Sequence, residues 1–275
     1  MFSPASTYLI NGRHEALSPL DRGFSYGDGV FRTFAIRLNS EKSPSIWATN
    51  YQKLVSDCRV LGIVCPNAKV LFDDMSHLLA ANELAVIKII ITRGEGARGY
   101  TPPAIAVPNR VVIKSALPSY PIINSIEGIT LRVCDIRLPQ QPKLAGIKHL
   151  NKLENVLAKM EWQNSEITDG ILLDTDNRVI ECTSSNIFVR SGTILTTPDL
   201  SQCGVAGVTR QRIIELAPSL GLTILIKNIL LTNLLQAEEV LVCNSLINAW
   251  QVTRLNDKHW QTQALAAKLS VLLQA

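Results

Sequence analysis

The chain has little of several features that mark particular classes of protein. Aromatic residues make up 5% of its 275 residues, and 27 Lys and Arg nearly balance 23 Asp and Glu. No basic run is present, so nucleic acid is not expected as a partner. The six cysteines form no CxxC pair, so no metal is expected. The longest strongly apolar run, residues 84–91, is far shorter than the roughly 20 residues that cross a bilayer, so no membrane association is expected.

The remaining composition, 47% hydrophobic and 18% charged, is that of an ordinary globular protein. Residues 1–4 carry neither the basic nor the apolar segment of a signal peptide, so we expect a cytoplasmic protein with reduced thiols. The length predicts one or two domains. The polar, proline-containing stretch 116–127 is the predicted boundary, which gives an N-terminal α/β domain (1–117) and a C-terminal α/β domain (118–275).

Hydrophobic periodicity predicts strands and helices that alternate through both halves, which is typical of the α+β or mixed α/β class. Asn11-Gly12 after a β-rich segment predicts an opening hairpin. The predicted helices are 47–61, 71–81, 150–162, 209–217, a short one near Leu234, and 262–273. The predicted strands are 7–10, 30–36, 86–92, 110–115, 129–136, 171–173, 179–181, 187–189, 194–196, 223–227 and 240–243.

A glycine-rich segment, residues 94–99, matches the GxGxxG pattern of dinucleotide-binding loops. That pattern binds a pyrophosphate where it opens a helix. Here Pro102 and Pro103 follow, and proline both removes amide donors and disfavours a helix. We therefore interpret the segment as a loop, in which Arg98 and Tyr100 could hold a carboxylate.

Three further positions suggest chemistry, and each also has an ordinary structural interpretation. Lys148 is predicted at a helix N-terminus, where the dipole would lower the pKa of its amine and favour attack on a carbonyl; taken alone, however, a surface lysine is the favoured interpretation. Glu181 ends a predicted strand and could bind a protonated ring nitrogen, or it could be solvated. Thr209, which follows Gly207 at a helix start, could bind phosphate or be only an N-cap. Pyridoxal phosphate requires all three functions together.

Several segments resemble one known family, the fold-type IV pyridoxal phosphate enzymes. Residues 21–31 (DRGFSYGDGVF) resemble its N-terminal signature, and residues 181–186 (ECTSSN) and 207–210 (GVTR) are similar to its later motifs, in the same order. The family includes branched-chain and D-amino acid aminotransferases and aminodeoxychorismate lyases. Residues 144–154 (LAGIKHLNKLE) are most similar to the lyases, and so is Arg98-Gly99-Tyr100.

This resemblance implies two α/β domains with pyridoxal 5'-phosphate in the cleft between them, and a homodimer. Lys148 would bond covalently to the cofactor, and Glu181 would pair with its ring nitrogen. The implied phosphate ligands are Val208, Thr209 and either Asn244 or Ser245, and the implied substrate-facing residues are Tyr26, Arg98 and Tyr100.

Three positions depart from the family pattern. Lys53 occupies the place of an arginine that usually holds the phosphate, and it lacks the bidentate fork of arginine. Asn50 stands where a histidine is common. Arg32 stands where relatives often have Glu or Thr, and the sequence offers no account of it.

The implied reaction converts 4-amino-4-deoxychorismate to 4-aminobenzoate and pyruvate, a step of folate synthesis. Lys148 would move the proton, and no amino acceptor would be needed. The first alternative is a class IV aminotransferase acting on D-amino acids or branched-chain amino acids, which requires a 2-oxo acid. The second is a non-enzymatic protein with weak cofactor binding, which the departure at Lys53 favours.

Overall fold

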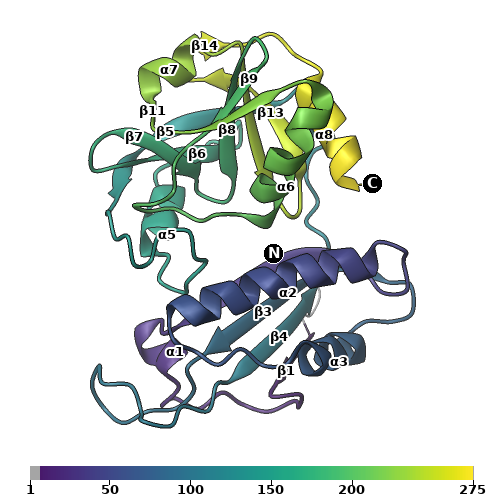
Figure 1. The fold of residues 1–275 in the computed structure, drawn as a ribbon, viewed down its shortest axis with the longest axis vertical. Helices are drawn as coiled ribbons and strands as arrows, with labels where there is room; N and C mark the ends of the chain where they lie inside the picture. The colour runs from purple at the N-terminus through teal and green to yellow at the C-terminus, as the bar shows by residue number, and fades with distance from the viewer. Residues whose placement is uncertain (1–6, 275) are drawn as a thin grey trace. The chain divides into compact units, whose positions relative to one another are not determined.

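The computed structural model describes residues 7–274, and the chain divides into two compact units (Figure 1). The first contains the chain up to Ser119 together with Ile147–Asn151, and the second contains Tyr120–Gly146 and Lys152–Ala275. The segment Ile147–Asn151, which the sequence-based boundary assigns to the C-terminal domain, thus belongs to the first unit. Residues 1–4, on which the predicted cytoplasmic location rests, lie outside the described residues.

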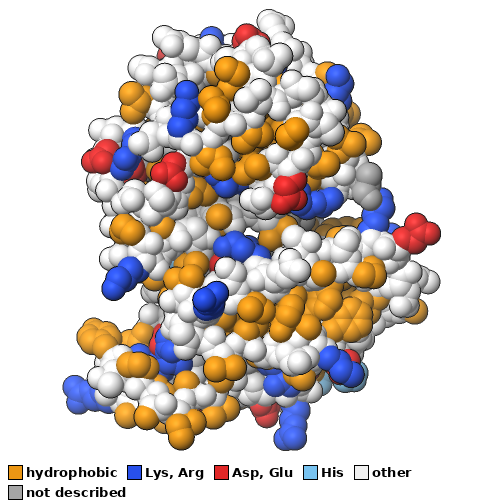
Figure 2. All heavy atoms as spheres, in the orientation of Figure 1, with side chains coloured by type: hydrophobic (Ala, Val, Ile, Leu, Met, Phe, Trp, Pro, Cys, Tyr) orange, Lys and Arg blue, Asp and Glu red, His pale blue; other side chains and the backbone are white. Residues whose placement is uncertain are grey.

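The first unit is built on an antiparallel sheet whose strand order, among the described residues, is β1–β4–β3–β2. Along β2, buried and part-buried residues alternate because one face of the strand packs against helices. Figure 2 shows hydrophobic side chains gathered between α2 (Ser43–Val60) and α3 (Ala68–Leu78) on the visible face. Ring contacts join Trp47 to Tyr51 within α2 and to Phe72 on α3. The elements are β1 (Thr7–Ile10), α1 (Arg22–Tyr26), β2 (Gly29–Arg37), α2 (Ser43–Val60), α3 (Ala68–Leu78), β3 (Leu84–Thr92) and β4 (Arg110–Ser115).

The predicted opening hairpin is only partly correct. Asn11 and Gly12 have the positive φ angles of a tight turn, and Ile10 forms a single bridge with Arg13. The described residues directly after this turn form no strand that could complete a hairpin, however, and β1 pairs with β4 instead. The two residues of the turn determine its backbone conformation, whereas contacts distant in the sequence determine which strand pairs with β1.

The second unit is built on a curled, mixed sheet with the order β10–β9–β8–β12–β13–β5–β6–β7–β11 in the described chain, and β14 pairs with β13. Its parallel pairs are β10–β9, β13–β5 and β5–β6. The strands are β5 (Ile129–Leu138), β6 (Ile167–Asp174), β7 (Arg178–Cys182), β8 (Asn186–Ser191), β9 (Ile194–Thr197), β10 (Thr223–Ile226), β11 (Ile229–Leu230), β12 (Glu239–Asn244), β13 (Asn248–Leu255) and β14 (Lys258–His259).

The two faces of this sheet are buried against different partners. One face forms a core of buried residues from β8, β12, β13, β5, β6, β7 and β11, and Trp250 and Trp260 belong to it. The other face packs Phe188 and Leu241 against α6 (Val208–Leu216) and α8 (Leu265–Gln274). The helices are α4 (Ile123–Ile126), α5 (Leu153–Met160), α6 (Val208–Leu216), the 3-10 helix η1 (Ala217–Leu220), α7 (Leu231–Gln236) and α8 (Leu265–Gln274). The predicted mixed helix and strand class is confirmed.

Helix α5 is shorter than its prediction. It begins at Leu153 rather than residue 150 and ends at Met160. Its apolar residues are largely exposed: Leu153 is 72% exposed and Met160 71% exposed, and Ala158 is its only buried residue. Among residues 7–274, no helix is long and apolar enough to span a bilayer.

Candidate active site

Lys148 lies in a short extended segment beside β2. The Phe31 N–H donates to the Lys148 carbonyl at 2.9 Å, and the Leu150 N–H donates to the Gly29 carbonyl at 3.0 Å. The Lys148 ammonium lies 4.6 Å from the centre of the Phe31 ring. Because α5 begins only at Leu153, Lys148 does not lie at a helix N-terminus, and its predicted place at the start of a helix is wrong.

A fully buried carboxylate, Asp57 on α2, lies beside this segment. Its Oδ2 accepts the backbone N–H of Lys148 at 3.2 Å and also pairs with the Arg32 guanidinium, while its Oδ1 accepts Lys53 Nζ at 2.5 Å. Burial lowers the pKa of Lys53 and of Arg32, and in both cases the negative charge of Asp57 opposes the shift. Lys53 is therefore an ion-paired residue and not a solvated one.

Asp57 was missed in the sequence, although a signal was present. The apolar positions of α2 include Leu54 and Cys58, and Asp57 precedes the second of them on the buried side. Arg32 occupies a core position in the alternating pattern of β2, between Val30 and Phe34. Opposite charges at buried positions of a packed helix and strand predict an ion pair, because a buried charge requires a partner. This pair accounts for the unexplained Arg32.

In the second unit, the Glu181 side chain is 5% exposed and fixes the loop that leads to α6. Its Oε2 accepts the Val205 N–H at 2.8 Å. The Asn186 amide holds the same loop twice, since its Nδ2 donates to the Val205 carbonyl at 2.7 Å and its Oδ1 accepts the Gly207 N–H at 3.1 Å. Gly146 pairs with residues 204–206 through two backbone hydrogen bonds.

This loop ends at an open helix N-terminus. The N-cap of α6 is Gly207, which has no side-chain cap, and Val208 and Thr209 are the first two residues of the helix. The Thr209 and Ser245 hydroxyl oxygens lie 3.4 Å apart. Arg210, in the first turn of α6, fixes the helix by donating to Thr197 Oγ1 at 3.1 Å and to the Pro198 carbonyl at 3.0 Å. Amides and paired hydroxyls at a helix N-terminus are a donor set suited to phosphate.

Asn244 and Ser245, both predicted beside the phosphate, have different surroundings. The Asn244 Oδ1 accepts the N–H groups of Leu246 and Ile247 at 2.8 and 3.0 Å, and its Nδ2 donates to the Ser184 carbonyl at 3.2 Å. Asn244 therefore orders the turn after β12, and Ser245 is the residue of the pair that lies beside Thr209.

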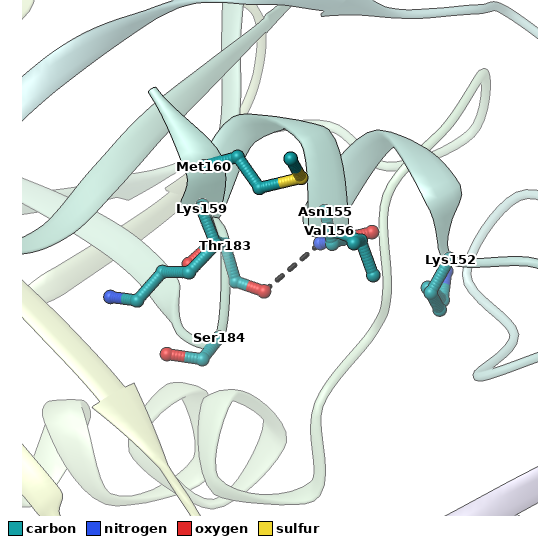
Figure 3. Close-up of a pocket in the computed structure, with 7 residues that line it drawn as sticks. All are labelled: Lys152, Asn155, Val156, Lys159, Met160, Thr183 and Ser184. Carbon is teal, nitrogen blue, oxygen red and sulfur yellow. Dashed lines mark hydrogen bonds between the residues drawn. The ribbon is translucent and has the colours of Figure 1, made fainter. Parts of the chain in front are cut away.

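A pocket of 490 Å³ lies next to the segment that follows Glu181 (Figure 3). Thr183 and Ser184 line it together with residues of α5, and the Asn155 Nδ2 donates to the Thr183 carbonyl at 3.0 Å. Buried Asp169 accepts the hydroxyls of Thr183 and Ser184. The described side chains include no cluster of His, Cys, Asp and Glu that could hold a metal.

The predicted substrate-facing residues lie together in the first unit. The rings of Tyr26 and Tyr100 are 5.5 Å apart, and the Tyr26 hydroxyl accepts the Gly99 N–H at 3.1 Å. Arg98 and Tyr100 are exposed. Buried Arg22 holds the loop by donating to the Gly99 and Tyr100 carbonyls at 3.0 and 2.9 Å. The segment is a loop and not the start of a helix, as interpreted from its prolines.

The predicted site residues thus form two groups. Lys148 and Lys53 share Asp57 in the first unit, where Tyr26, Arg98 and Tyr100 also lie, and Glu181, Val208, Thr209, Asn244 and Ser245 belong to the second.

The class IV amino-transferase family matches residues 29–255, so the chain belongs to that family, as its motifs predicted. It is 34% identical to the aminodeoxychorismate lyase of Vibrio harveyi over 97% of this chain and 98% of that protein. It is 26% identical to a D-alanine aminotransferase of Listeria monocytogenes, over 91% of this chain and 86% of that one. The crystal structure of 4-amino-4-deoxychorismate lyase from Pseudomonas aeruginosa superposes with a TM-score of 0.91, at 39% identity, over 98% of each chain.

Proposed function

We propose that the protein is a pyridoxal 5'-phosphate-dependent lyase that converts 4-amino-4-deoxychorismate to 4-aminobenzoate and pyruvate in the cytoplasm. The observation that carries this proposal is the end-to-end similarity to proteins named as such lyases, 34% and 39% identical over nearly the whole of both chains. The D-alanine aminotransferase is 26% identical. The 144–154 segment, which is most similar to the lyases, supports the same assignment.

The residues of both units fit the cofactor. We assign its phosphate to the Val208 amide and the hydroxyls of Thr209 and Ser245, because the N-terminus of α6 has no capping side chain. Glu181 is a buried carboxylate held in place by a backbone amide, and it suits a protonated ring nitrogen. Lys148 supplies the amine that bonds to the aldehyde. We propose, as the family resemblance implies, that the protein is a homodimer.

Two residues of the chain have separate roles in the proposed reaction. When bound, pyridoxal phosphate supplies a sink for the electrons left by removal of a proton from the substrate. Lys148 removes that proton from the carbon that carries the amine. Glu181 keeps the ring nitrogen protonated through its negative charge. In the overall reaction the C–H bond at the amine-bearing carbon and the C–O bond to the enolpyruvyl group break, and the ring becomes aromatic. The released enol takes up a proton to become pyruvate, and the product retains its amine.

The test is turnover of 4-amino-4-deoxychorismate with no 2-oxo acid present. We expect pyruvate and 4-aminobenzoate in equal amounts through many turnovers. Lys148→Ala, in the same assay, should abolish turnover and the visible absorbance of the covalently bound cofactor. An enzyme that stops after about one equivalent and resumes when 2-oxoglutarate is added would instead be an aminotransferase.

The same purified protein also tests the non-enzymatic alternative. This alternative predicts a protein that stays colourless with added pyridoxal phosphate and forms no product. A coloured, active protein rejects that alternative.

A further inference from the structure

The two oxygens of the Asp57 carboxylate are divided between two residues of the proposed cofactor site. Oδ1 accepts the ammonium of Lys53, one helical turn away on α2. Oδ2 accepts the backbone N–H of Lys148, 91 residues further along the chain. The same carboxylate therefore fixes the Lys53 side chain, which occupies the place where the family usually has a phosphate-binding arginine, and the main chain of Lys148, the proposed nucleophile.

Arg32 permits a charge to be buried here. Asp57 is 0% exposed and Arg32 is 4% exposed, and the guanidinium pairs with Oδ2. The Arg32 Nε has no hydrogen-bond partner among the described residues, so the arrangement leaves a buried donor unsatisfied. Two apolar side chains of similar volume would stabilise such a helix and strand contact as well or better. Stability alone therefore does not account for this set of residues.

The charge of the set suits a site for an anion. Two cations and one anion leave one net positive charge, the same as a single arginine. Asp57 keeps the Lys53 side chain, 22% exposed, in a defined position. A lysine held by a carboxylate regains part of the fixed direction that it lacks relative to an arginine.

We propose that Asp57 is a positioning residue that fixes the Lys148 backbone and the Lys53 ammonium together, with Arg32 neutralising its charge. The inference rests on the proposed function, in which Lys148 bonds to the cofactor. Asp57 itself touches neither substrate nor cofactor in this proposal; it acts through the two lysines.

Hydrogen exchange of the Lys148 amide tests the first link without an activity measurement. The full-length protein is measured with pyridoxal phosphate and after its removal, with fragmentation that resolves single amides. Asp57→Leu should speed exchange at Lys148 about tenfold or more in the cofactor-free protein, as expected for loss of a hydrogen bond to a charged group. The Leu150 amide, bonded to Gly29, is the internal control and should change far less. Asp57→Asn retains an acceptor oxygen and should largely preserve protection.

The double variant Arg32→Met/Asp57→Leu separates positioning from simple packing. It removes both buried charges, so its thermal midpoint should exceed that of Asp57→Leu. Exchange at Lys148 should nevertheless stay fast, and cofactor affinity should stay low. Recovery of both stability and Lys148 protection would overturn the proposal, as would equal acceleration at Lys148 and Leu150.

Cofactor affinity, measured by equilibrium dialysis, tests the second link. Lys53→Met and Asp57→Asn should each raise the cofactor dissociation constant several-fold. The dissociation constant of the double variant Lys53→Met/Asp57→Asn should not exceed the larger of the two single-variant values. Additive losses would show that Asp57 does not act through Lys53. If the parent protein lacks lyase activity, the proposed function fails, whereas the exchange and dialysis results still decide the role of Asp57.

Discussion

The Glu181 carboxylate accepts the backbone N–H of Val205 at 2.8 Å, which joins the end of β7 to the loop before α6. The two residues are 24 positions apart, and the bond requires an oxygen at this place but no particular charge. A glutamine can accept the same N–H. The position of the side chain and its charge can therefore be separated by mutation.

Glu181→Gln should cost far more in turnover than in stability. The amide oxygen can keep the Val205 bond, whereas a neutral side chain cannot hold a proton on the ring nitrogen. We expect kcat to fall by about 100-fold or more, roughly 3 kcal/mol of barrier, with a thermal midpoint near that of the parent. Glu181→Leu, which loses the Val205 bond as well, should also be destabilised. A loss of turnover below tenfold in Glu181→Gln would contradict the assigned role.

Gly207→Ala should weaken both folding and cofactor binding. An added Cβ at Gly207 would overlap the Asn186 Oδ1, and that amide is buried and held by two hydrogen bonds. We expect a loss of about 1–3 kcal/mol of unfolding free energy, typical of overpacking, measured by urea denaturation. In an Asn186→Ala background the added methyl group has space, so its own cost should largely vanish. A full cost in that background would place the strain elsewhere.

Arg22→Lys should loosen the loop that carries Arg98. A lysine keeps a positive charge for Asp28. Its donors all lie on one nitrogen, however, whereas Arg22 uses Nε for Asp28, Nη1 for the Gly99 carbonyl and Nη2 for the Tyr100 carbonyl. We expect trypsin to cut after Arg98 about tenfold faster or more than in the parent, and the KM for substrate to rise more than kcat falls. Arg98→Gln in the same background removes the cleavage site and identifies the product. Unchanged cleavage would show that Arg22 does not restrain the loop.

Stability of the first unit should depend on the ionisation of Asp28. Burial alone would raise the pKa of Asp28, but hydrogen bonds from Arg93 and Arg22 outweigh it, so the pKa lies below its usual value. The ionised carboxylate therefore contributes stability that is fully present above about pH 4 and is lost as the pH falls through the lower folded-state pKa.

The corresponding comparison is Asp28→Asn against the parent, by urea denaturation from pH 7 to pH 3. The difference in unfolding free energy should be constant above about pH 5 and shrink below about pH 4. Asp135→Asn, at a side chain 89% exposed, is the control for loss of a surface carboxylate. A difference for Asp28→Asn that grows towards low pH would have the wrong sign for this mechanism.

Strand β4 was predicted with its observed bounds, Arg110–Ser115, because a short β-rich run between polar segments is a local signal. Strand β13, Asn248–Leu255, was missed, although Trp250 and Val252 alternate with polar neighbours. Helix α5 was predicted too long, since helical spacing at residue 150 was outweighed by pairing of the 148–150 segment with β2. Each failure lies where a distant strand determines the local conformation.

By itself, the sequence determined the family and the residue types that carry chemistry. The motifs at 21–31, 181–186 and 207–210 and the lysine at 148 are contiguous, and contiguous residues can be recognised without a fold. The tertiary structure alone decided how those residues are held: Asp57 at the Lys148 amide, Glu181 at the Val205 amide, and Asn186 around the Gly207 loop. These bonds join residues between 21 and 91 positions apart. Such pairs depend on how helices and loops pack against a sheet, which no local periodicity encodes.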